Sequence, residues 1–420
     1  MSDSDPTEAP SDRTGPAPAP DAVPRQGHGH GPDRPAGRRI RWLLAAGVVP
    51  LLLATLLGLV ALWPSGTTPG DISLDGLGGT PGAAFPVGTV TGLDTSGCAD
   101  GGACTAQVSL DDPPQDGPAT GTVQLDPQIA DVVDVGDRLR LVSVDAGGEQ
   151  ILSFVDFERT VPIAVLALLY AVVVVAVARW RGLRALLGLG FGYLVLVRFM
   201  LPALLEGGPP AAIALVGSGA IMLVVLYAAH GLSARTTTAL LGTAAGLLVT
   251  TALAVWATPA AHLTGTGGED ALTLQQAPAL DLASVVLVGM VVAGLGVLND
   301  VTITQASAVW ELHDADPTAS RRTLFGRAMR IGRDHIASTV YTIAFAYAGA
   351  MLPTLLLVLL YRRPFGQSLT SGDLAEEVVR VLVGSIGLVL AIPLTTAVAV
   401  AVRRAGPDAV QEPRSTQQAR

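Results

Sequence analysis

The sequence predicts an α-helical polytopic membrane protein with about eight transmembrane helices and a small extracytoplasmic β-rich domain. Half of its 420 residues are hydrophobic and only 15% are charged, whereas soluble globular domains carry about 25% charged residues. Most apolar residues gather in runs of about 20, the length that a membrane helix needs. One long stretch, 64–160, instead alternates short β-like runs with clusters of Gly, Asp and Pro.

The N-terminal segment 1–40 is rich in Pro, Ala, Asp and Gly, and we expect a disordered cytoplasmic tail. Its Gly27–Gly31 stretch holds two histidines, too few to predict a metal site. Arginines then precede the apolar run Trp42–Trp63, which is longer than the core of a signal peptide and has Trp at both ends. We therefore predict a retained first transmembrane helix over 41–63.

The segment 64–160 is predicted to fold outside the cytoplasm as an OB-like barrel or a sandwich. From Ser65 to Thr160 it contains fifteen Asp and Glu but three Arg, an excess that argues against nucleic acid as its partner. Cys98 and Cys104 enclose a tight loop, and an extracytoplasmic location favours a disulfide between them. The alternative, a metal pair, needs further ligands that are not nearby, and we expect no metal and no cofactor.

The remaining apolar runs predict a seven-helix membrane domain over 161–402, followed by a disordered cytoplasmic tail over 403–420. The spans are predicted at 161–178, 185–205, 210–229, 236–257, 280–300, 335–360 and 376–401. Arginines cluster in alternate connections, which places both chain termini in the cytoplasm by the positive-inside rule. Arg362 and Arg363 break this pattern, because they would face outward.

The sixth predicted span ends in a polar stripe. Asp300, Thr304, Ser307 and Glu311 are spaced by four, three and four residues and so share one helix face, and they are flanked by Thr302 and Gln305. A helix from Leu280 to Leu312 is longer than a bilayer requires, so two registers are open. In one register Asp300 caps the helix at the interface, and in the other it lies inside the membrane, where an acid is a functional candidate.

A second constellation meets the start of the next span. It consists of Arg333, Asp334, His335, Thr339 and Thr342. An Asp–His pair at a membrane entry suits proton relay, because imidazole titrates near neutral pH. The alternative is an arginine-rich anchor whose acid complements the helix dipole.

A third polar group opens the last span. Glu376 and Glu377 lie four and three residues before Arg380, and these spacings predict an ion pair on the helix surface.

Four of these stretches together resemble the YibE/F family of bacterial membrane proteins. They are "HGLSARTTTALLGTAAG", "GVLNDVTITQASAVWEL", "IGRDHIASTVYTIAFAYAGAMLP" and "LAEEVVRVLVGSIGLVLAIPLTT". The resemblance covers about residues 160–402 and extends to the layout of a β segment followed by spans. It implies a multi-pass protein of the bacterial plasma membrane and marks the Asp300 and Asp334–His335 segments as family hallmarks. It supplies no substrate and no catalytic residue.

Two functions follow as expectations. The first is a transporter or channel for a small solute or ion in the lipid bilayer, with the polar residues of the two stripes on its path. The second is a non-catalytic assembly or sensing protein whose extracytoplasmic domain binds a protein partner. We expect no enzyme, because the Gly-x-Gly-Asp spacing of intramembrane aspartyl proteases is absent and no second membrane aspartate accompanies Asp300.

Overall fold

The computed structural model of the chain describes residues 38–66, 84–98, 104–113, 119–145, 150–267, 271–275, 277, 279–361 and 364–404. The expected N-terminal tail up to residue 37, with its two histidines, lies outside these residues. So do residues 405–420 of the expected C-terminal tail and the pair Arg362 and Arg363, which are expected to face outward.

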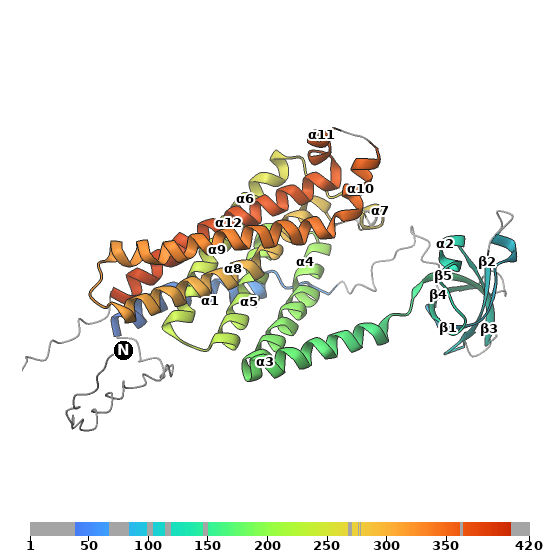
Figure 1. The fold of residues 1–420 in the computed structure, drawn as a ribbon, viewed down its shortest axis with the longest axis horizontal. Coiled ribbons are helices and arrows are strands. Elements are labelled where there is room, and N and C mark those ends of the chain that lie inside the picture. Colours follow the sequence, from blue (N-terminus) through green and yellow to red (C-terminus); the bar gives the residue numbers. More distant parts are fainter. Residues whose placement is uncertain are drawn as a thin grey trace, which may run out of the picture. The chain divides into compact units, whose positions relative to one another are not determined.

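Helices make up most of the described chain (Figure 1). The long ones are α1 (Arg38–Ala61), α3 (Thr160–Val195), α5 (Pro210–His230), α6 (Ala234–Ala260), α8 (Leu282–Ala315), α9 (Arg321–Ala350) and α12 (Gly372–Arg404). The shorter ones are α2 (Pro127–Ala130), η1 (Ser96–Cys98), η2 (Leu196–Met200), α4 (Leu201–Leu205), α7 (Ala271–Leu274), α10 (Leu352–Leu360) and α11 (Phe365–Leu369).

Side chains cap the start of three long helices. Ser233 Oγ accepts a hydrogen bond from the backbone N–H of Thr236 at the start of α6, and Ser320 does the same for Thr323 at the start of α9. Asp281 accepts from the backbone N–H groups of the first turn of α8. Each cap satisfies a backbone donor that the helix itself leaves free, which fixes where the helix begins.

Six helices in the described chain are long and apolar enough to cross a membrane, or up to seven if the bent pair α9–α10 counts as one span. In this count the continuous stretch Thr160–Leu205, which comprises α3, η2 and α4, enters once. The prediction of about eight spans divides the same stretch into two, 161–178 and 185–205.

The Thr160–Leu205 stretch is broken at Arg179, whose φ of 54° and ψ of −134° are not helical. The ribbon of α3 turns sharply between its two arms (Figure 1). A Cβ on Gly182 would lie 2.5 Å from the carbonyl oxygen of Val174, so the fold needs glycine where the second arm passes the first. The N-terminal arm is apolar, and its most apolar 18-residue window buries none of its residues in this chain.

Three helices, α6, α8 and α12, pack closely at the centre of the helical region. Thr243 meets Thr302 of α8, and a Cβ on Gly246 would lie 2.8 Å from Leu298 and 2.9 Å from Ala391 of α12. Such small residues let neighbouring helices approach closely, as membrane helix interfaces require. As the residue number rises along α6, the contacting residues of α8 and α12 fall in number. Both helices are therefore antiparallel to α6.

Two predicted spans differ in extent from the helices that contain them. α8 continues fifteen residues beyond the predicted end at 300, to Ala315. α9 begins at Arg321, fourteen residues before the predicted start at 335, and bends by 65° into α10 near Met351. The arginines of its first turns favour a loop by composition, but Leu324, Ala328 and Gly332 lie on one buried face and hold this part as a helix.

The β-rich domain is a closed five-stranded barrel, which decides between the two predicted architectures. Its strands are β1 (Val87–Asp94), β2 (Cys104–Leu110), β3 (Thr120–Leu125), β4 (Arg138–Asp145) and β5 (Gln150–Phe157), in the order β1-β2-β3-β5-β4. Only the β3–β5 pair is parallel among the described strands, as in the Greek-key barrels of OB type. Alternate residues such as Val108, Val123 and Leu141 fill the interior.

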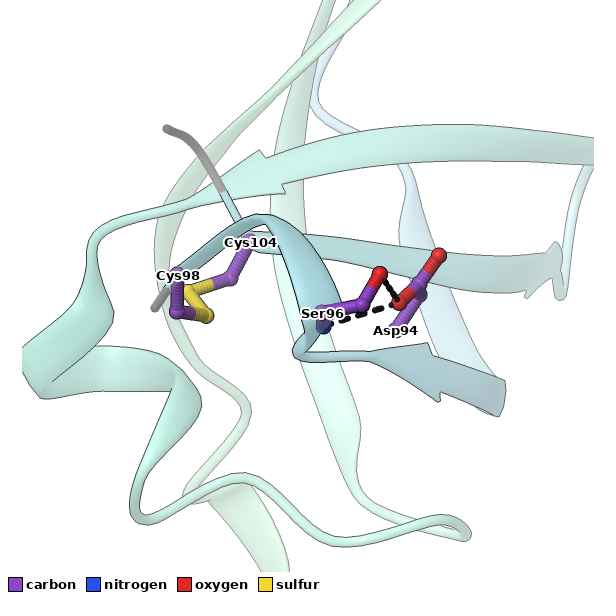
Figure 2. Close-up of a disulfide and its surroundings, with 4 residues drawn as sticks. All are labelled: Asp94, Ser96, Cys98 and Cys104. Atoms are coloured by element: carbon purple, nitrogen blue, oxygen red, sulfur yellow. Dashed lines mark hydrogen bonds between the residues drawn. A yellow bond between two sulfur atoms is a disulfide. The ribbon is translucent and has the colours of Figure 1, made fainter. Parts of the chain in front are cut away.

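Cys98 and Cys104 form a disulfide at the edge of the barrel, with their Cα atoms 5.0 Å apart (Figure 2). It joins the short helix η1 to the first residue of β2. Beside it, Ser96 donates hydrogen bonds to Asp94 from its backbone N–H and its hydroxyl group. These hydrogen bonds lower the pKa of the Asp94 carboxyl.

The junction between β5 and α3 predicts a pH dependence. The hydroxyl of Thr160, the guanidinium of Arg140 and the backbone N–H of Thr160 all donate to Glu158, and they lower its pKa to about 2. A lowered carboxyl pKa stabilises the fold above its ordinary value of 4.5, and this contribution is lost as the pH falls from 4.5 through about 2.

We therefore expect the amides around Thr160 to stay protected from hydrogen exchange down to about pH 4.5 and to lose protection in more acidic buffer. In Glu158→Gln the protection should be low throughout and should not change over that interval. Equal profiles for the two proteins, after correction for intrinsic exchange, would contradict the assignment.

Candidate functional site

The structure brings together one residue from each of the two main predicted constellations. Nε2 of His335, on α9, lies 3.9 Å from Oδ2 of Asp300, on α8. The Asp300 side chain is 72% exposed and that of His335 is 30% exposed. Nε2 of His335 is covered and has no hydrogen-bond partner among the residues that the structure describes. The pair is close enough for charge attraction but too far apart for a direct hydrogen bond.

Asp300 lies near the middle of its helix. It is ten residues from Trp310 and twelve from Val288, or about 15 Å and 18 Å along α8 at 1.5 Å per residue. Thr243 of α6 contacts Thr302 of α8, and the two helices are antiparallel. If residues continue to pair in this register, Trp310 lies opposite Ala234 at one end of α6, and Val288 lies opposite Trp256 near the other end. Asp300 is thus remote from both ends of the packed helices.

The predicted stripe on α8 forms an outer face of the packed helices. Asp300, Thr304 and Glu311 are exposed, and Ser307 is half-buried between them. The hydroxyls of Thr304 and Ser307 donate to the backbone carbonyls of Asp300 and Ile303, four residues earlier. These two hydroxyl groups therefore donate within their own helix. The carboxylates of Asp300 and Glu311 instead need hydrogen-bond donors from outside it.

Thr302 and Gln305 lie on the opposite, buried face of α8. The hydroxyls of Thr302 and Thr243 are 2.5 Å apart in the α6–α8 contact. Gln305, only 3% exposed, donates from Nε2 to the carbonyl oxygen of Ala328 at 3.0 Å and to the Thr396 hydroxyl at 2.7 Å. These two residues join helices to one another, and the structure separates them from the Asp300 stripe.

On α9 the predicted residues divide between two faces. Asp334, His335, Ser338 and Thr342 follow one another at helical spacing beside the α8 stripe, and all but His335 are exposed. Arg333 precedes His335 by two residues and so points to the other side of α9. Thr339 donates its hydroxyl hydrogen bond to the carbonyl oxygen of His335 and is half-buried.

A small open cleft lies between α8, α9 and α12. It is lined by Ala293, Gly294, Val297, Ile343, Tyr347, Arg380, Val381 and Gly384. Val297 is one turn from Asp300 on α8, and Ile343 is about two turns from His335 on α9, so the cleft adjoins the Asp300–His335 pair. Tyr347 is not among the predicted site residues, because nothing in its local sequence distinguishes it from other tyrosines.

Arg380 is the charged residue of this cleft. Its Nη1 lies 3.0 Å from the Glu377 carboxylate, whereas Glu376 instead accepts a hydrogen bond from the backbone N–H of Gly265 at 2.8 Å. The third predicted group therefore separates into an ion pair on α12 and a contact with the chain that follows α6.

Ion pairs also connect α8, α9 and α12 at the end of the helices where the chain passes from α8 to α9. Arg403 of α12 pairs with Asp314 and lies over the ring of Trp310, 5.4 Å from its centroid. Arg327 lies 3.0 Å from Asp316. Ion pairs thus join the last turn of α8 to α12 and the turn after α8 to α9.

The fold and this site define a class of protein: a mainly helical chain with several helices able to cross a membrane, a polar face midway along two of them, and a small barrel. The chain belongs to the YibE/F-like protein family, which matches residues 166–405. This match includes the whole polar face and leaves the barrel outside. Comparisons with curated proteins and with solved structures found no match.

Proposed function

We propose that the chain is a multi-pass protein of the plasma membrane that moves a small solute or ion along the polar face of α8 and α9. The observation that carries this proposal is the Asp300–His335 pair, which joins two helices midway between the ends of the packed helices. In this proposal α3 counts as two crossings on either side of Arg179, which gives eight crossings with both termini in the cytoplasm.

The distribution of arginines supports this orientation. Arg235 begins α6, Arg403 ends α12 beside Trp310, and Arg179 and Arg181 lie where α3 turns. The first residues of α1 are also arginines. The helix directions place all of these at one end, which the positive-inside rule assigns to the cytoplasm.

The lengths of the helices support a position of Asp300 deep in the bilayer. The interval from Arg235 to Trp256 on α6 covers about 32 Å, close to the thickness of the hydrocarbon core. Asp300 then lies near the midplane, and its exposed carboxylate would be costly in contact with lipid. A water-filled path relieves this cost, and a carboxylate beside an imidazole can hold a cation or pass a proton.

Thiol accessibility tests the path. The two native cysteines are joined in the disulfide, so a cysteine introduced at Thr304 is the reactive one. We expect a membrane-impermeant maleimide to label Thr304→Cys at least about tenfold faster than Val49→Cys, because water reaches the first site and lipid covers the second. Val49 is an exposed residue of α1, and the Gly47–Leu241 and Thr243–Thr302 contacts place it at a similar depth. Equal, slow labelling of both variants would refute the path.

Flux tests the role of Asp300. Proteoliposomes that contain a pH-sensitive dye receive a pH step, and proton entry is followed with and without a potential. We expect Asp300→Asn to reduce the protein-dependent flux at least about tenfold and the exposed barrel variant Asp112→Asn to leave it unchanged. Flux that is the same in Asp300→Asn and in the unmodified protein would remove Asp300 from the mechanism.

A second candidate function, assembly or sensing through the barrel, is favoured by one observation. Phe85, Ile151 and Val155 are large apolar side chains on the barrel, and each is about half exposed or more. Exposed apolar groups of this kind are typical of protein contacts when they form a patch. Deletion of residues 70–155 separates the two functions: surviving flux supports transport, and loss of a co-purifying protein supports assembly.

A further inference from the structure

α9 differs from the other long helices in its composition. Among the described helices of at least 18 residues, it alone reaches the apolarity of a membrane span only together with a neighbour, α10. Yet α9 lies at the edge of the packed helices and buries only Leu324, Ala328, Gly332 and Ile343. The helix with the least apolar composition therefore has one of the most open faces.

The open face of α9 has the pattern of a helix–helix contact. Apart from the adjacent residues Arg333 and Asp334, its members recur at steps of three and four, and all are exposed: Arg330, Arg333, Asp334, Ala337, Tyr341, Ala344 and Ala348. This spacing lines up one seam along a helix, as in coiled coils. The alanines would allow a second helix to come close, which is how membrane helices associate.

Charge complementarity identifies the partner. Arg333 and Asp334 flank the seam at the same depth, and neither has an ion-pair partner among the residues that the structure describes. A two-fold axis along the membrane normal brings residues of equal depth together. Arg333 of one copy then faces Asp334 of the other, and the second pair follows by symmetry.

We propose that a second copy of this chain packs on this seam, α9 against α9, with two symmetric Arg333–Asp334 ion pairs between the copies. The contact covers the charges that would otherwise face lipid and leaves the Asp300 stripe, on another side of the α8–α9 pair, free. It rests on different observations from the transport proposal, and the two share only Asp334, which lies at the edge of the seam next to His335.

Disulfide crosslinking of the full chain in native membranes tests the seam. Ala344→Cys lies on the seam, and Ala346→Cys lies two residues away at nearly the same depth but on the opposite side of α9. Both alanines are exposed, so both variants should fold. We expect mild oxidation to yield at least about tenfold more crosslinked dimer from Ala344→Cys. Equal yields from the two variants, or no dimer from either, would overturn the proposal.

A charge exchange tests the ion pairs in the Ala344→Cys background. We expect Arg333→Asp to reduce the dimer yield several-fold, because it places four acids at the contact. Combining it with Asp334→Arg restores two opposite pairs and should restore the yield. Failure of the combined variant to recover, while its purified protein remains folded by circular dichroism, would overturn the pairing.

Discussion

Gly246→Val is expected to lower the free energy of unfolding of the helical region by about 3 kcal/mol or more, the upper range for an overpacked core. A Cβ at this position would lie 2.8 Å from Leu298 and 2.9 Å from Ala391, so α6 would have to move away from two helices at once. The loss is measured by equilibrium unfolding in mixed micelles, with tryptophan fluorescence as the signal. Trp256 and Trp310 report on α6 and α8, and the described barrel residues include no tryptophan.

Gly296→Val is the matched control. Gly296 lies on the exposed side of α8, and no atom lies within 4 Å of an added Cβ. The same substitution there should change the free energy of unfolding by less than about 1 kcal/mol, the scale of helix propensity alone. If the two variants unfold alike, close packing at Gly246 is not what holds α6, α8 and α12 together.

Gln305→Ala is expected to lower the free energy of unfolding by about 3 kcal/mol. The change removes two hydrogen bonds from the buried amide, to Ala328 and Thr396, and leaves a cavity where three helices meet. The same unfolding titration measures the loss.

Gln305→Met separates the two causes. Methionine fills nearly the same volume without the amide, so it should cost only about 1 kcal/mol, the net worth of hydrogen bonds between membrane helices. A Gln305→Met protein as unstable as Gln305→Ala would show that the hydrogen bonds outweigh the packing. A fully stable Gln305→Ala protein would show that the residue does not hold the helices.

Most of the architecture of the chain can be predicted from its sequence. Long apolar runs predict the helices, because about 20 consecutive apolar residues are the length that a membrane helix needs. The alternating runs between Ser65 and Thr160 predict the β domain, and the closed barrel confirms one of its two predicted forms. The family match confirms the resemblance carried by the polar stretches.

The arrangement of the residues in the candidate site is harder to predict from the sequence. Asp300 and His335 lie 35 residues apart on two helices, and no local pattern fixes which faces of α8 and α9 meet. Polar residues occur on both faces of α8 between Asn299 and Glu311, so the sequence does not show that Gln305 points inward while Thr304 points outward. The break at Arg179, in contrast, falls between the two spans predicted at 161–178 and 185–205.

The position of Gln305 has a consequence for motion. Its amide joins α8 to α9 and α12 at one level, where a Cβ added to Gly332 would lie 3.1 Å from Gln305 Oε1. Beyond Gly332, α9 buries only Ile343 before it bends near Met351. The part of α9 beyond Gly332 is thus held by fewer buried side chains than the part that Gln305 anchors. Any motion of α9 that leaves the Gln305 contacts intact would have to occur in this part, which lines the cleft with Ile343 and Tyr347.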